Sequence, residues 1–193
     1  MGMSRETYER KFREFFAEVL SLVDEEVQQW KEHQIEVRKK QINPDEFIYV
    51  VEWQGRALNA FALEFHTPHP YIALYYDANS HAIAQLPTKP SKKEMELNTF
   101  RDLLIFFMRS TIIAEAKKVA LQEGFFSRIV GNNLRVFIGS YEFTLEYWVK
   151  SNIWEVRCTS DPKVLWEKYP CGNQHPVEFL ASLLKSLALK VLL

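Results

Sequence analysis

The chain has 193 residues, 47% hydrophobic and 14% aromatic, so it can bury a substantial core and is not intrinsically disordered. Its formal net charge of −1 excludes a strong overall attraction to nucleic acid or to anionic membranes, but leaves room for local basic patches. The two cysteines, the charged N-terminus without an apolar signal core, and the lack of a long apolar run predict a cytoplasmic protein without a membrane partner.

The first predicted element is a long amphipathic helix over residues 4–41. Aromatic and aliphatic residues recur three and four positions apart from Tyr8 to Trp30, and mixed charge occupies the opposite face. This apolar stripe thins beyond Trp30, and Asn43-Pro44 is expected to end the helix.

Four short apolar runs follow, over residues 46–53, 57–65, 71–77 and 81–86. Gln54-Gly55-Arg56 and Ala78-Asn79-Ser80 separate two pairs of these runs and are typical of hairpin turns. Because short connections join antiparallel neighbours, the runs predict a meander.

A second long helix is predicted from about residue 92 to residue 123, and it is apolar nearly all round after Phe100. Four further strands are predicted over residues 126–130, 134–138, 141–149 and 153–159. Asp161-Pro162 then predicts a short helix, and His175-Pro176 opens a last, strongly apolar helix.

This order predicts an α+β fold, α-ββββ-α-ββββ-α-α, with the helices packed on one or two antiparallel sheets. We expect residues 1–193 to form a single compact domain. The halves 4–90 and 91–193 match in element order and are candidate pseudo-repeats, but their residues do not repeat.

No catalytic motif is evident, which favours a non-enzymatic protein without a cofactor. The glycines form neither a dinucleotide fingerprint nor a phosphate loop, and there is no nucleophile elbow. We predict no metal site, because two candidate groups lack ligand geometry: one falls at opposite ends of a strand and the other has no fourth ligand. The groups are His66, His69, Asp77 and His81, and Cys158, Cys171 and His175.

Two features predict a surface that binds a protein. If Lys150-Ser151-Asn152 is a three-residue loop, Trp148 and Trp154 lie opposite each other on one face, which is either covered by the last helix or exposed to a partner. The last helix carries more apolar surface than one contact face needs, at Leu180, Leu184, Leu187 and Val191. If that surface is an interface, Leu184→Asp would leave a folded protein of smaller native mass; if it is core, the change would abolish folding.

The leading hypothesis is therefore a non-enzymatic interaction protein, such as an adaptor, assembly chaperone or inhibitor, that acts as a homodimer or as a subunit of a complex. One alternative is a small-molecule or catalytic pocket between a meander and its helix, lined by Tyr49, Trp53, Tyr75 and His81. The other is single-stranded nucleic-acid binding through Lys89, Lys92 and Lys93.

Overall fold

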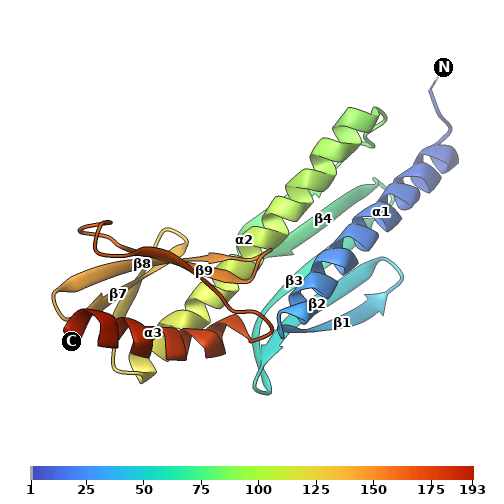
Figure 1. The fold of residues 1–193 in the computed structure, drawn as a ribbon. Coiled ribbons are helices and arrows are strands. Elements are labelled where there is room, and N and C mark those ends of the chain that lie inside the picture. Colours follow the sequence, from blue (N-terminus) through green and yellow to red (C-terminus); the bar gives the residue numbers. More distant parts are fainter. Residues whose placement is uncertain (1) are drawn as a thin grey trace. The chain divides into compact units, whose positions relative to one another are not determined.

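The computed structural model describes residues 2–193, and in them it shows three helices and two five-strand antiparallel sheets (Figure 1). The helices are α1 (Arg5–Glu32), α2 (Pro90–Gln122) and α3 (Pro176–Leu192). The first sheet is a meander of β1 (Glu36–Asn43), β2 (Glu46–Trp53), β3 (Arg56–His66), β4 (Tyr71–Tyr76) and β5 (Asn79–Ile83). The second is a meander of β6 (Phe126–Val130), β7 (Asn133–Ile138), β8 (Tyr141–Trp148), β9 (Ile153–Cys158) and β10 (Trp166–Pro170). The predicted α+β class with two antiparallel meanders is confirmed.

Each meander has one strand more than predicted. The first additional strand is β1, which replaces the predicted C-terminal part of the first helix. The helix ends at Glu32, Gln34 takes a φ of 63°, and residues 36–43 pair antiparallel with β2. Arg, Lys and Gln have good helix propensity, but pairing with the apolar strand β2 prevails over that weak preference.

The second additional strand is β10. The predicted short helix after Asp161-Pro162 does not form; this segment is a turn that leads into Trp166–Pro170, which pairs with β9. Asp161 and Pro162 suit a turn as well as a helix start, since Asp161 accepts a hydrogen bond from the backbone N–H of Lys163 at 3.1 Å.

The described chain divides into two compact units. The first holds residues 2–31 and Glu36–Phe106, and the second holds residues 32–35 and Phe107–Leu193, so the boundary falls within α2. The expectation that residues 1–193 form a single compact domain stays a prediction.

In the first unit, α1 lies along one face of the first sheet (Figure 1). The apolar stripe predicted from the sequence forms this contact: Phe12 and Phe16 meet Phe65 edge-on or tilted, at ring-centroid distances of 5.9 and 5.6 Å. Tyr49 of β2 is fully buried beneath the helix and donates a hydrogen bond to Asp24 at 2.8 Å. The first half of α2 reaches the same sheet through Glu96, which binds His81 of β5 at 2.8 Å.

In the second unit, the second half of α2 and all of α3 cover one face of the second sheet. Arg109 of α2 donates to the carbonyl oxygen of Tyr147 at 3.1 Å, and Trp154 of β9 donates to that of Pro176 at 3.0 Å. The buried face of the sheet is built from alternate residues of β7, β8 and β9, as expected for strands with one covered side. Its members are Leu134, Val136, Ile138, Phe143, Leu145, Tyr147, Trp154, Val156 and Cys158. Within residues 2–193, no helix is long and apolar enough to cross a membrane.

Candidate functional site

The turn between β8 and β9 decides which side chains the second sheet presents to solvent. Trp148 pairs with Ile153 and Tyr147 with Trp154, so the turn holds residues 149–152 and is one residue longer than predicted. Asn152 closes it at a φ of 53°, where its side chain accepts from Tyr147 and donates to the backbone of Gly172 and Gln174. Because side chains alternate along a strand, this one-residue shift places the two tryptophans on opposite faces. The predicted Trp148–Trp154 pair is therefore wrong.

Trp154 belongs to the core rather than to a binding surface. It has no solvent exposure, its ring lies 5.1 Å from that of Tyr147, and its indole N–H is bound to Pro176. A fully buried indole with a bonded N–H has no atom left for a partner.

The last helix is also part of the core on the face that was predicted to bind. Leu180, Leu184 and Leu187 have no solvent exposure, and Val191 is half-buried. These leucines recur every three or four residues and point into the second unit. Their outward neighbours, Leu189, Leu192 and Leu193, are 63%, 60% and 98% exposed. Most of the apolar surface predicted on this helix is therefore buried within the chain.

The outer face of the second sheet carries an exposed aromatic pair. Trp148 of β8 is 39% exposed and Trp166 of β10 is 59% exposed. Glu155 of β9 lies between them: it accepts the indole N–H of Trp148 at 2.9 Å and that of Trp166 at 2.8 Å. These two bonds hold the pKa of Glu155 below its usual value, so the carboxylate is charged at neutral pH.

This arrangement, the Trp–Glu–Trp site, consists of Trp148, Glu155 and Trp166. A shared acceptor restrains both indoles without burying them, so the rings are ordered and still accessible. Trp166 was not among the predicted site residues, because its segment was predicted to belong to the short helix that Asp161-Pro162 opens and that does not form. The sequence offered little signal there, because residues 166–170 mix charged and aromatic side chains on both faces of the strand and show no clear alternation.

A second aromatic cluster lies on the same outer face, at its β6 edge. Phe126 is 66% exposed and its ring lies 5.5 Å from that of Phe137, while the guanidinium of Arg128 lies 5.8 Å from the Phe137 ring. Arg128 and Arg135 both approach Glu142, at 3.6 and 3.4 Å. The cations at this end of the face are therefore paired on the sheet itself.

The outer face of the first sheet also carries a carboxylate that accepts a hydrogen bond from an exposed aromatic side chain. Glu64 of β3 accepts from Tyr75 and contacts His66, both at 2.7 Å. Tyr75 is 37% exposed, and the hydrogen bond to Glu64 raises its pKa to about 12. Its cross-strand partners are small, Ala62 on β3 and Ser80 on β5, and so is Ala73 two residues earlier on its own strand. Tyr75 therefore differs from Trp148, because small side chains rather than a second exposed indole lie beside it.

The predicted pocket residues do not gather in one place. Tyr49 lies under α1, whereas Tyr75 lies on the opposite face of the sheet, bonded to Glu64. Trp53 ends β2 opposite Arg56, and His81 of β5 binds Glu96 of α2. The alternation of side chains along the strands separates Tyr75 from Tyr49, and two strands lie between β2 and the β5 strand that holds His81.

The predicted basic cluster lies at the start of α2. Lys89 and Lys92 are exposed, whereas Lys93 contacts Glu18 at 4.0 Å and lies 5.8 Å from the ring of Phe15. Lys93 borders a depression of about 260 Å³ that Lys11, Glu14 and Glu18 also line. The carboxylates balance the cations there, which weakens the attraction for phosphate.

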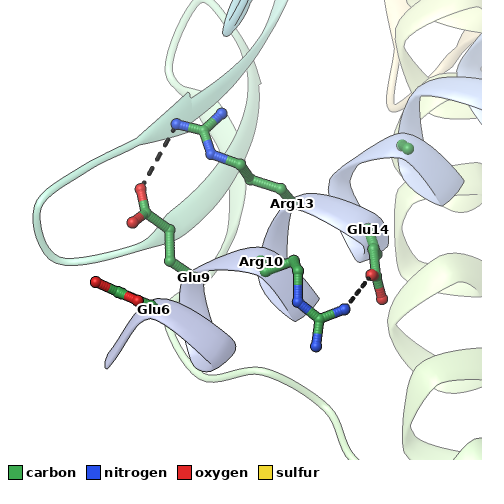
Figure 2. A pocket seen from close by; sticks show the side chains of 6 residues that line it. Glu6, Glu9, Arg10, Arg13 and Glu14 are labelled. Carbon is green, nitrogen blue, oxygen red and sulfur yellow. Dashed lines mark hydrogen bonds and ion pairs between the residues drawn. The ribbon is translucent and has the colours of Figure 1, made fainter. Parts of the chain in front are cut away.

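A wider depression on α1 is lined by residues of that helix alone (Figure 2). Arg10 binds Glu14 at 2.9 Å, and Arg13 binds Asp45 at 2.7 Å and Glu9 at 3.6 Å. These ion pairs lie on an exposed helix face, where such pairs contribute little to stability.

The buried surroundings of Cys158, Cys171 and His175 indicate that these residues have structural roles. Cys158 and Cys171 are buried free thiols, and burial raises the pKa of Cys171 to about 12. His175 caps α3 by accepting the backbone N–H of Val177 at 3.1 Å, and its burial lowers its pKa to about 4 despite the opposing effect of Glu115. Across residues 2–193, no three His, Cys, Asp or Glu side chains are grouped so as to hold a metal ion.

Neither a protein-family model nor a curated protein sequence matches this chain.

Proposed function

We propose that this chain is a non-enzymatic protein–protein interaction protein that binds its partner through the Trp–Glu–Trp site. The observation that carries the proposal is the pair of exposed, restrained indoles. Tryptophan is among the residues that most often dominate binding energy at interfaces, and restraining its ring before binding lowers the entropic cost of association.

The proposed binding surface differs from the one predicted from the sequence. The buried leucines of α3 and Trp154 form the scaffold, and Trp148 and Trp166 on the opposite side of the sheet bind the partner. An adaptor, assembly chaperone or inhibitor in the cytoplasm is consistent with this organisation, and the two free thiols support a reducing compartment.

The test compares the wild-type protein with a Trp148→Ala/Trp166→Ala double variant, both expressed at native level and cross-linked before purification. We expect the double variant to keep its circular dichroism spectrum and to lose at least one protein that is cross-linked to the wild type. The Tyr75→Ala variant is the matched control, because Tyr75 is an exposed aromatic residue on the outer face of the other sheet.

The proposal would be abandoned if the double variant retained every cross-linked protein while Tyr75→Ala lost one. Small-molecule binding and nucleic-acid binding stay predictions; the scattered pocket residues and the paired charge of Lys93 give them less support than the tryptophan pair gives protein binding.

A further inference from the structure

The Trp–Glu–Trp site restricts the chemistry of its partner, on the assumption that the proposed function is correct. Both indole N–H groups are already bound to Glu155, at 2.9 and 2.8 Å. Tryptophan has no other hydrogen-bonding atom. The exposed parts of Trp148 and Trp166 are therefore apolar ring surface, which suits apolar side chains and cannot read a polar group by hydrogen bonding.

Two cations stand beside the rings together with the carboxylate of Glu155, whose two oxygens are both bound to the indoles. Lys168 pairs across the strands with Glu155, and Arg157 pairs with Trp166, so both cations stand on the outer face beside the indoles. Both side chains are exposed, and their charges help to lower the pKa of Glu155, although no ion pair within 4.0 Å involves either cation among residues 2–193. The Nζ of Lys168 also lies 5.8 Å from the Trp148 ring, where it occupies the position that a partner's cation would take.

We propose that the partner contributes an acidic, apolar protein segment. Its apolar side chains cover the rings of Trp148 and Trp166, and its carboxylates pair with Arg157 and Lys168. Apolar contact supplies the affinity, while the charge pairs fix the orientation and speed the association.

Two other occupants fit the same face less well. Nucleic acid would bring phosphates against Glu142, Glu146 and Glu155, which stand on this face among the cations. A second copy of this chain, docked about a twofold axis at the tryptophans, would place Arg157 and Lys168 against the same cations of the other copy. A folded protein segment can place a few carboxylates beside Arg157 and Lys168 and apolar side chains elsewhere, whereas the regularly spaced phosphates of nucleic acid would also meet the three glutamates.

The experiment is a selection from a random-sequence peptide library, carried out in parallel on the full-length wild type and on Trp148→Ala/Trp166→Ala. We expect the peptides enriched only on the wild type to carry an excess of Asp and Glu together with large apolar residues. Their affinity should fall at least tenfold in the Arg157→Glu/Lys168→Glu variant and should weaken as salt rises. A Lys40→Glu variant, which changes an exposed cation of the first sheet, should bind them as the wild type does.

The outcomes separate this inference from the proposed function. Peptides that depend on the tryptophans but are neutral or basic would overturn the acidic partner and leave protein binding at the site intact. Enrichment that is identical on the wild type and the double variant would overturn the site itself. Retention of a random single-stranded DNA pool by the wild type and not by the double variant would replace the protein partner with nucleic acid.

Discussion

Trp148 and Trp154 lie on neighbouring strands of the second sheet and occupy opposite environments. Trp154 has no solvent exposure and is bonded to the start of α3, whereas Trp148 is 39% exposed and is bonded to Glu155. The two faces of one sheet therefore separate the buried core from the proposed binding site. A residue on the covered face should affect folding when changed, and a residue on the outer face should affect only association.

The largest difference between the faces is expected on α3 itself. Leu184→Asp places a carboxylate in a position without solvent exposure, and we expect it to cost more than about 4 kcal/mol and to prevent folding. Leu189→Asp, at a position 63% exposed, should change the free energy of unfolding by less than about 0.5 kcal/mol. Urea denaturation measures the free energy of unfolding of both variants. A folded Leu184→Asp protein would indicate that this face of α3 is an interface rather than core.

The tryptophans provide the next comparison. Trp154→Ala should destabilise the protein by about 3–5 kcal/mol, since it removes a fully buried ring and leaves a cavity. Trp148→Ala should cost less than about 1 kcal/mol, because its ring is partly in water already. Equal losses in chemical denaturation would mean that the outer face is covered in solution.

The pH dependence of the free energy of unfolding tests the covered face, because His175 caps α3 there. Its pKa falls from 6.5 in the unfolded chain to about 4 in the fold, because burial disfavours the charged ring. The unfolded state therefore binds the proton first as the pH drops, and the stabilisation present above pH 6.5 is lost progressively toward pH 4, by roughly 3 kcal/mol in full.

The measurement for His175 is the free energy of unfolding at pH 7 and pH 4.5, for the wild type and for His175→Asn. Asparagine can also cap a helix but does not titrate in this range. The wild type should lose about 2 kcal/mol more than the variant between the two pH values. A parallel loss in both proteins would show that other groups cause the acid sensitivity.

The smallest expected effect concerns the end of α3. Gly139 and Gly131 both have a φ of 61°, so an alanine at either is strained by about 1 kcal/mol. Only at Gly139 would the added Cβ meet a neighbour, Leu192 Cδ2 at 2.8 Å. Gly139→Ala should therefore be the more destabilising change, by less than about 1 kcal/mol because the Leu192 side chain can move. Thermal unfolding of the pair should resolve this, and equal values would mean that Leu192 does not rest on the β7–β8 turn.

The sequence alone predicted the α+β class, the two meanders, and most strand positions. The strands at Glu46–Trp53 and Phe126–Val130 have the bounds that were predicted. Periodicity carries this information, because a strand with one covered face alternates and a helix with an apolar stripe repeats every three to four residues. It failed at β1 and β10, whose exposed, charged sequences have little apolar pattern and become strands by pairing with a neighbour.

Only the tertiary structure decided which face each side chain of the second sheet occupies. The sequence predicted Trp148 as a binding residue, which stays a prediction, but it also assigned Trp154 to the same face and left Trp166 out. The reason is that a hairpin register depends on the length of its turn, here set by Asn152 and its three hydrogen bonds to Tyr147, Gly172 and Gln174. Two of these partners are 20 and 22 residues away in the chain, so no local pattern contained the information.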